Sequence, residues 1–436
     1  MKLKNKGSVF LLGLLFLSAH AQVTELPMAV EEVVQLALEN HSQLKMSEQN
    51  VNIAKQQTKV VELQKLPSLS ASASAFYLGD ALLLDPDFSK VATVPMPHFG
   101  NTYGVQASQL IFKGGLLKRN IEMYRLREQI SELDLQRDRQ NIKFLVTANF
   151  LDIERLINQR NVYLNNRKLA QQRLENVRKF YQQGMVTRNE VIRGELMIKN
   201  LDQAILILDN NRATLNYQLA TAIGISPEVL IKPVQIMESG DPASTLDRYL
   251  ALAHANSPAL QSAQTSVAVA EKNQQVAKSE KMPTVAAFAG YAMNRPVTNT
   301  TPALNMYSNA WQAGLSLNYN IDNLYKSREH EALADMQAEQ ARNMLKLQTD
   351  NIDISVNAAY LKYKEAIKQA EILKESEVLA NENYRIIEAK YLNQLALQAD
   401  MTDAQNAKLE AELQYSNAEI NVIYQYYNLL KSVGTL

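Results

Sequence analysis

Four stretches of the chain carry hydrophobic positions at helical spacing. The two long ones run over about 114–183 and 324–394, and the shorter ones that follow them run over about 187–222 and 398–431. Apolar residues recur in them every three or four positions between Arg, Glu, Gln and Asn, and none of the four contains a proline. A helix of about 70 residues is about 100 Å long, well beyond those of ordinary globular domains. The pattern predicts two long helices, each followed by a shorter return helix.

Other segments alternate between apolar and polar residues, which is the period of a β-strand. They predict one β-hairpin at about 67–112 and another at about 283–321, each with a polar, proline-containing loop in the middle. In the last strand, for example, Trp311 and Leu315 fall on one face and Gln312 on the other. Each chain is therefore expected to contribute four strands.

The two halves of the sequence resemble each other. Residues 40–67 align without a gap on residues 256–283, at an offset of 216, and later matches continue at an offset of 210. We therefore predict two tandem structural repeats, over 22–232 and 233–436. Each repeat contains helices, a β-hairpin, a long helix and a return helix, in that order.

The N-terminus has the pattern of a secretory signal peptide over residues 1–21. Three lysines within the first six residues precede an apolar run from Val9 to Leu17 and a small-residue site at Ala19-His20-Ala21. The mature chain is expected to begin near Gln22 and to be exported.

Composition excludes several classes of function. The 45 basic side chains balance the 45 acidic ones, so no basic excess favours nucleic acid. Without cysteine, disulfides, thiolate metal sites and acylation of an N-terminal cysteine are excluded. The five histidines are scattered, and neither a zinc-protease motif, a nucleophile elbow nor a phosphate-binding loop is present. We expect no enzyme activity, no cofactor and no metal site.

After the signal segment, no apolar run reaches the ~18 residues of a membrane-spanning helix, so insertion into a membrane would have to use strands. Four strands cannot close a membrane barrel, because the smallest have about eight. A dimer would pool about eight strands and a trimer about twelve, and closure would satisfy the backbone groups in lipid. The sequence thus predicts an α+β membrane protein, mostly α-helical, in which a helical tunnel leads to a β-pore.

At this point the chain resembles the TolC family of outer-membrane efflux channels. The resemblance rests on the tandem halves and on three local motifs: Leu66-Pro67 and Met282-Pro283 before the strands, the strand-to-helix junction over 109–115, and the closing segment over 430–436. It implies a homotrimer with a long periplasmic α-helical barrel joined to a 12-stranded outer-membrane β-barrel, four strands per protomer. It also implies two kinds of partner, a periplasmic adaptor protein and an inner-membrane pump of the RND, ABC or MFS class.

Two carboxylates near the second helical turn are candidate pore residues. Asp400 and Asp403 are three residues apart and share one helix face. Spacing alone is consistent with an ordinary solvated face. The resemblance implies instead that three copies, each with Tyr391 nearby, form a periplasmic entrance with a selectivity ring of carboxylates, which would attract cations.

The matching turn of the first half contains Thr187 and Glu190. By spacing they form a capping box, which explains both residues. The resemblance implies instead that Glu190 bonds to the hydroxyl of Tyr391 as an entrance latch. Ala396 stands where the best-known family member has an arginine of that latch, so the resting state, open or closed, is left undecided.

The expected function is an outer-membrane exit duct of a tripartite efflux or type I secretion system, with a tunnel extending into the periplasm. It would passively conduct small molecules or polypeptide delivered by an inner-membrane pump. The alternative is a periplasmic coiled-coil scaffold or adaptor that never inserts into the membrane. No motif identifies the cargo or the pump class, and strand counting alone does not distinguish a trimer from a dimer.

Overall fold

The computed structural model describes residues 25–234, 240, 244–300, 302–393 and 395–436. The predicted signal peptide, residues 1–21, lies outside these described residues. The helices are α1 (Val30–Asn40), α2 (Ser42–Glu62), α3 (Leu116–Gln182), α4 (Arg188–Ile223), α5 (Leu246–Asn256), α6 (Pro258–Lys278), α7 (Asn323–Leu392) and α8 (Gln398–Val433). The strands are β1 (Glu25–Met28), β2 (Ser68–Tyr77), β3 (Ala81–Leu84), β4 (Lys90–Val94), β5 (Phe99–Phe112), β6 (Leu230–Pro233), β7 (Thr284–Arg295) and β8 (Ser308–Asn318).

The order of elements repeats in the two halves, which confirms the two-repeat architecture. The long helices α3 and α7 have 67 and 70 residues, and the return helices α4 and α8 have 36 each. Even the N-caps of α2 and α6 correspond: His41 Nδ1 accepts a hydrogen bond from the N–H of Gln43, and Ser257 Oγ accepts one from the N–H of Leu260. Each cap satisfies a backbone donor that the first helical turn leaves free.

Two compact units cut across these repeats. The helical unit comprises the described residues within Met1–Ala37, Val146–Glu238 and Leu373–Ile420, and the sheet unit comprises those within Leu38–Leu145, Ser239–Ile372 and Asn421–Leu436. Each unit therefore combines pieces of both halves of the sequence. The repeats describe the sequence and the order of elements. The compact units form because elements of one repeat pack against elements of the other.

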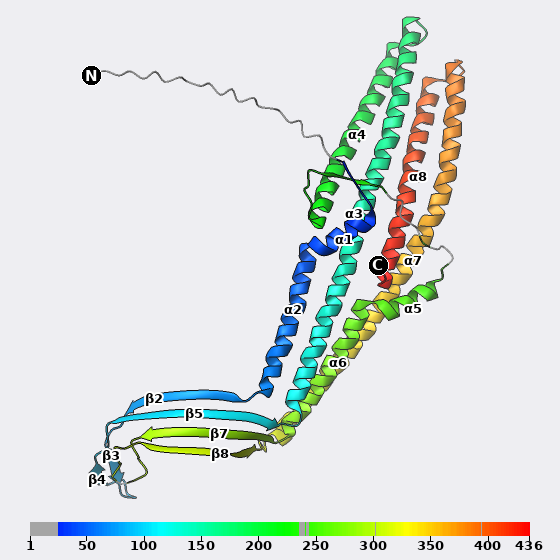
Figure 1. The fold of residues 1–436 in the computed structure, drawn as a ribbon. Helices are drawn as coiled ribbons and strands as arrows, with labels where there is room; N and C mark the ends of the chain where they lie inside the picture. The colour runs from blue at the N-terminus through cyan, green and yellow to red at the C-terminus, as the bar shows by residue number, and fades with distance from the viewer. Residues whose placement is uncertain (1–24, 235–239, 241–243, 301, 394) are drawn as a thin grey trace, which may run out of the picture. The chain divides into compact units, whose positions relative to one another are not determined.

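The sheet unit contains a four-stranded antiparallel sheet in the order β2, β5, β7, β8 (Figure 1). The two predicted hairpins form its halves, and the pairing of β5 with β7 joins them, for example at Val105 opposite Tyr291. Within the described chain, β2 and β8 each have a neighbour on one side only. Both outer edges of the sheet therefore keep unpaired backbone groups.

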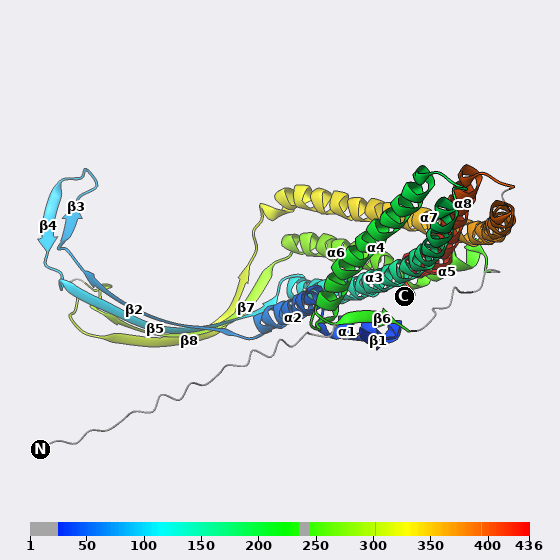
Figure 2. The same ribbon diagram turned by 90° about the horizontal axis from the view of Figure 1, so that it is seen from above.

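The polar, proline-containing loop of the first hairpin has structure of its own, which was not predicted from the sequence. Residues within it form a second, smaller hairpin, β3 paired with β4, beyond the ends of β2 and β5 (Figure 2). In the turn of this hairpin, the N–H of Asp85 donates to the carbonyl oxygen of Ser89, and the N–H of Phe88 donates to the carbonyl oxygen of Asp85. Phe88 adopts a left-handed φ of 67°. A further parallel pair, β1 with β6, belongs to the helical unit and was not expected either.

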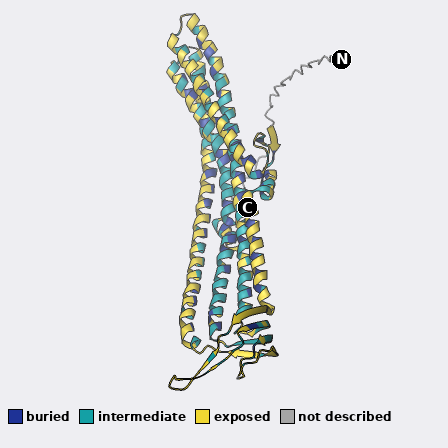
Figure 3. Cartoon of the chain, turned by 90° about the vertical axis from the view of Figure 1, so that its left-hand side faces the viewer, coloured by how far each residue is buried: buried dark blue, intermediate teal, exposed yellow. Residues whose placement is uncertain are grey.

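The outer strands β2 and β8 are almost wholly exposed, whereas most residues of β7 are half-buried (Figure 3). All ten residues of β2 are exposed, and Trp311 on β8 is 79% exposed. Within the helical unit, Phe150 and Leu219 are fully buried, and in the sheet unit Tyr363 is nearly so. Among the described helices, none combines the length and the apolar character needed to cross a membrane.

A glycine pair directs the chain from β5 into α3. Gly114 and Gly115 have φ values of 56° and 79°, which residues with a Cβ rarely adopt, and a Cβ on Gly114 would lie 2.6 Å from Met282 Cγ. The Arg119 guanidinium then donates to the carbonyl oxygen of Gly114 at 2.5 Å and to that of Gln275 at 3.2 Å. Arg119 therefore connects the β5-to-α3 junction of the first repeat to the end of α6 in the second repeat.

Candidate functional site

The helical unit contains two equivalent helix turns, one between α3 and α4 and one between α7 and α8 (Figure 1). The N–H of Met185 donates to the carbonyl of Phe180 at 2.9 Å, and the N–H of Leu395 donates to that of Lys390 at 2.8 Å. Both are the wide backbone bonds of a Schellman-type helix end. In the first turn Gly184 supplies the left-handed residue, with a φ of 75°.

Asp400 and Asp403 both lie in the first turns of α8 and are exposed. The carboxylate of Asp400 accepts a hydrogen bond from the backbone N–H of Leu397 at 2.9 Å. It therefore satisfies a free donor at the positive end of the helix, which gives it a local structural role. Both side chains remain open to solvent and so remain available to a cation.

Thr187 and Glu190 do not form the expected capping box. Thr187 is the N-cap of α4, with an extended backbone, but its side chain makes no capping hydrogen bond. The N–H of Glu190 instead donates to the backbone carbonyl of Thr187 at 3.1 Å. The capping-box interpretation is wrong because the carboxyl of Glu190 lies among residues of other helices, where Oε2 is buried without a hydrogen-bond partner.

Arg173 of α3 is the centre of this cluster. Its guanidinium carbon lies 5.3 Å from the ring centroid of Tyr391 on α7, and its Nη1 donates to Oε1 of Gln405 on α8 at 2.7 Å. Burial lowers the pKa of Arg173, while the nearby Tyr391, Tyr384, Glu388 and Glu190 act in the opposite direction. The arginine thus links three helices through one side chain.

Tyr391 is held through its ring. Its hydroxyl is buried and has no hydrogen-bond partner among the described residues, so it makes no bond to Glu190 within this chain. Burial raises the pKa of Tyr391, Arg173 lowers it and Glu190 raises it. Glu190 is therefore an electrostatic neighbour of Tyr391 here, and the cation–π contact with Arg173 fixes the ring.

An ion-pair ladder joins α3 to α4. Arg160 pairs with Asp209 at 2.7 Å, Arg167 pairs with Asp202, and Arg178 pairs with Glu195 at 2.7 Å. Arg173 lies between the last two rungs on α3, and the α4 residues that share a cavity with it include Arg193, Gly194 and Met197. None of the described residues that line this cavity is a carboxylate.

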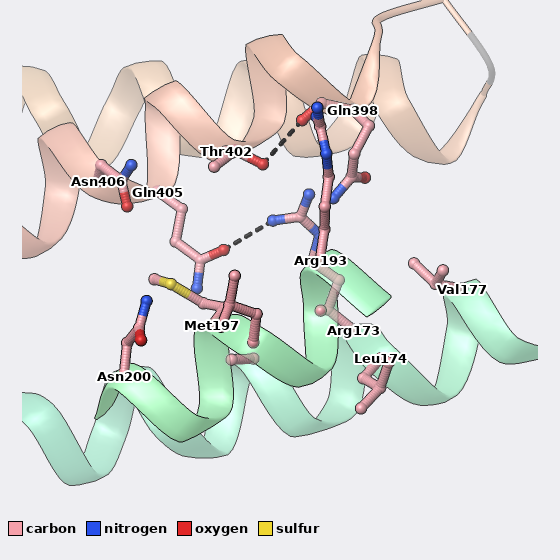
Figure 4. Close-up of a pocket in the computed structure, with 13 residues that line it drawn as sticks. Arg173, Leu174, Val177, Arg193, Met197, Asn200, Gln398, Thr402, Gln405 and Asn406 are labelled. Atoms are coloured by element: carbon pink, nitrogen blue, oxygen red, sulfur yellow. Dashed lines mark hydrogen bonds between the residues drawn. The ribbon is translucent and has the colours of Figure 1, made fainter. Parts of the chain in front are cut away.

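The cavity has a volume of about 340 Å³ and is lined by α3, α4 and the start of α8 (Figure 4). The side chains of Arg173 and Arg193 both extend toward α8 in this view. Its lining consists of Ala170, Arg173, Leu174, Val177, Arg193, Gly194, Leu196, Met197, Asn200, Gln398, Thr402, Gln405 and Asn406. The close approach of α3 depends on Gly194, since a Cβ there would lie 2.9 Å from Leu174 Cδ1.

Sequence reasoning identified Tyr391 and Glu190 but missed Arg173 and Gln405. The two missed residues carry no distinctive motif, since Arg173 is one of several arginines on α3 and Gln405 lies in a run of polar residues. Position 396 is an alanine, so it does not supply the cation that the family resemblance places there. Arg173 of α3 supplies a cation to the cluster around Tyr391 instead. Across the part of the chain that is described, no group of three or more His, Asp and Glu side chains is arranged to hold a metal ion.

Comparisons with known proteins agree with this architecture. The family model for outer membrane efflux proteins matches residues 33–225 and 249–435. No curated protein sequence is similar enough to count as a match.

Three solved channels have the same fold. CusC superimposes with a TM-score of 0.80 at 16% identity, covering 96% of this chain and 95% of CusC. VceC from Vibrio cholerae gives 0.77 at 13% identity, covering 93% and 96%. The open state of MtrE from Neisseria gonorrhoeae gives 0.75 at 16% identity, covering 93% and 88%.

The family model spans most of the chain, so the resemblance to TolC-type channels is confirmed. The helices and the exposed sheet correspond to the periplasmic tunnel and the outer-membrane part of such channels. The chain belongs to the outer membrane efflux protein family and is an outer-membrane protein.

Proposed function

We propose that this protein is the exit duct of a tripartite efflux or type I secretion system. It conducts small molecules or polypeptide passively from an inner-membrane pump to the exterior. The observation that carries the proposal is a sheet with one exposed apolar face and two open edges, attached to helices of 67 and 70 residues. A soluble scaffold has no use for such a sheet.

The apolar face continues across all four strands. Ala71 on β2 lies opposite Val105 on β5, which lies opposite Tyr291 on β7, which in turn lies opposite Trp311 on β8. Because successive residues alternate between faces, the same register aligns polar and small residues on the other side, for example Gln312 opposite Gly290. One face therefore suits lipid and the other suits a water-filled lumen.

Closure requires further copies of the chain. In lipid, the unpaired backbone groups at the edges of β2 and β8 would each be strongly unfavourable. Pairing β8 of one copy with β2 of the next removes both edges. We propose a homotrimer, which pools about twelve strands, because the family resemblance favours it over a dimer with about eight.

In the helical unit, we propose that Asp400 and Asp403 of three copies form the entrance selectivity ring, and that Tyr391 and Glu190 belong to an entrance latch. Both aspartates are exposed at the start of α8, which supports a role at the pore surface. Tyr391 and Glu190 share the cluster around Arg173, which supports a joint role in holding the turn. The driving force comes from the proposed partners, a periplasmic adaptor and an inner-membrane RND, ABC or MFS pump.

Single-channel recording in a planar bilayer tests this function. The purified protein should give small, cation-selective currents that a multivalent cation blocks, and the Asp400→Ala/Asp403→Ala variant should conduct without block. Block that survives the double substitution contradicts the ring assignment. A protein that stays soluble without detergent and gives no current contradicts the channel and supports the scaffold alternative.

A further inference from the structure

The cavity between α3, α4 and α8 contains two positive charges and no negative one among the described residues that line it. Its volume of about 340 Å³ is within the range of small-molecule sites. Like charges that line one cavity repel each other, and an anion between them relieves that repulsion.

Arg173 has donors left over for such an anion. Only Nη1 has a protein partner, Gln405, while Nε and Nη2 are buried without any hydrogen-bond partner among the described residues. A buried guanidinium with two unpaired nitrogens is unfavourable, because these donors have lost water and gained nothing. Nε and one Nη together are the donor pair that binds a carboxylate in bidentate geometry.

Arg193 is the second cation and is exposed at the edge of the cavity. Its neighbours along the α3–α4 ladder are paired, as Arg178 is with Glu195, but no described carboxylate lies within ion-pair distance of Arg193. The ladder therefore lacks a negative charge at the position of the cavity.

The other wall of the cavity is apolar. Leu174, Val177 and Met197 contribute to it, beside Ala170 and Leu196. A fully hydrated inorganic anion would leave this wall unused. Glu190 and Glu388 also act on Arg173 from nearby, so the local positive charge suits a monoanion better than a dianion.

We propose that this cavity binds a small organic monocarboxylate with a compact apolar body, of the size of a benzoate. The carboxylate lies between Arg173 and Arg193, and the apolar body contacts Leu174, Val177 and Met197. Since the lining comes from α3, α4 and α8, a bound ligand ties the start of α8 to the first helical hairpin. The proposal does not rest on the proposed conduction function, although the cavity shares Arg173 with the cluster around Tyr391.

Fluorine NMR of 4-fluorobenzoate, titrated into the purified full-length protein in detergent, tests the proposal directly. The neutral isostere 4-fluorobenzamide reports partition into the micelle and onto the apolar wall alone. We expect saturable binding of the benzoate, at least about tenfold tighter than that of the benzamide, because charge-assisted hydrogen bonds distinguish them.

Variants locate the site. Arg193→Ala changes an exposed side chain, so folding should be unaffected, and Arg173→Met removes the buried cation while keeping most of the side-chain volume. Each should weaken benzoate binding by about tenfold or more. The matched control is Arg178→Ala, which is on α3 like Arg173 but lies outside the cavity. It should change the affinity for the benzoate by less than about twofold.

Three results would overturn the proposal. They are the absence of saturable benzoate binding to the unmodified protein, equal affinity for the benzoate and the benzamide, and an Arg178→Ala effect as large as that of Arg193→Ala. The first two need no variant, so the test does not depend on whether Arg173→Met folds.

Discussion

The contact between Arg173 and Tyr391 leads to a prediction that separates the ring of the tyrosine from its hydroxyl. The hydroxyl is buried without a partner in the described chain, whereas the ring lies 5.3 Å from the guanidinium carbon. Tyr391→Phe removes only the hydroxyl, and Tyr391→Leu removes the ring as well. If the ring holds the turn closed, the two variants should behave differently.

The expected magnitudes follow from these contacts. A cation–π pair with a largely desolvated arginine contributes about 1–2 kcal/mol. If three copies open together, Tyr391→Leu removes about 3–6 kcal/mol from the closed state, which shifts the open-to-closed ratio by about 10² to 10⁴. Tyr391→Phe keeps the contact and removes an unsatisfied buried hydroxyl, so it should not favour opening.

Open probability in single-channel recordings measures this difference. Tyr181→Leu is the matched control, because Tyr181 is the repeat-related tyrosine at the end of α3, is 44% exposed and belongs to the first turn. We expect a large rise for Tyr391→Leu and little change for Tyr391→Phe and Tyr181→Leu. A rise for Tyr391→Phe equal to that for Tyr391→Leu would refute the ring-based reasoning and indicate that the hydroxyl bonds to a neighbouring copy.

Three further predictions concern stability in thermal or denaturant unfolding. Asp400→Ala should destabilise the protein by about 1 kcal/mol per chain, because the hydrogen bond from the Leu397 N–H is lost. Asp400→Asn can still accept this hydrogen bond and should lose less stability, so equal losses of stability would contradict the capping role. Arg119→Ala should remove about 1–2 kcal/mol, because it removes charge-assisted hydrogen bonds to two carbonyl oxygens, one of them part-buried. Arg125→Ala, at an exposed ion pair, should remove less than about 1 kcal/mol, and the reverse order would count against the role of Arg119. Burial raises the pKa of Glu154 in the folded state above its unfolded value, so the contribution of Glu154 to folding stability becomes unfavourable as pH rises through the interval between the two pKa values. Glu154→Gln should therefore be more stable than the unmodified protein at neutral pH. A stability difference between the two proteins that does not change with pH would exclude this effect.

Local sequence signals predicted the elements closely. The long helices were expected at about 114–183 and 324–394 and run over Leu116–Gln182 and Asn323–Leu392. Hydrophobic periodicity and the placement of proline and glycine are properties of neighbouring residues, so they are readable without a fold. The internal repeat was readable for the same reason, since a duplicated segment keeps its pattern wherever it packs.

The smaller hairpin of the first loop was missed although its signals were present. An Asp-Pro-Asp turn separates two apolar runs, from Ala81 and from Lys90, which is a pattern typical of a hairpin. The parallel pair of β1 and β6 had no such signal, because its strands are far apart in the chain and each has only four residues.

The sequence by itself determined the family, the two repeats, the helix lengths and the amphipathic strands, because these depend on local spacing. The tertiary structure decided that β5 pairs with β7, that Glu190 leaves Thr187 uncapped, and that Arg173 meets Tyr391 and Gln405. It also decided that two arginines share one cavity. Such contacts join residues from separate helices, and which arginine on a long helix finds a partner depends on how the helices pack, which no local pattern specifies.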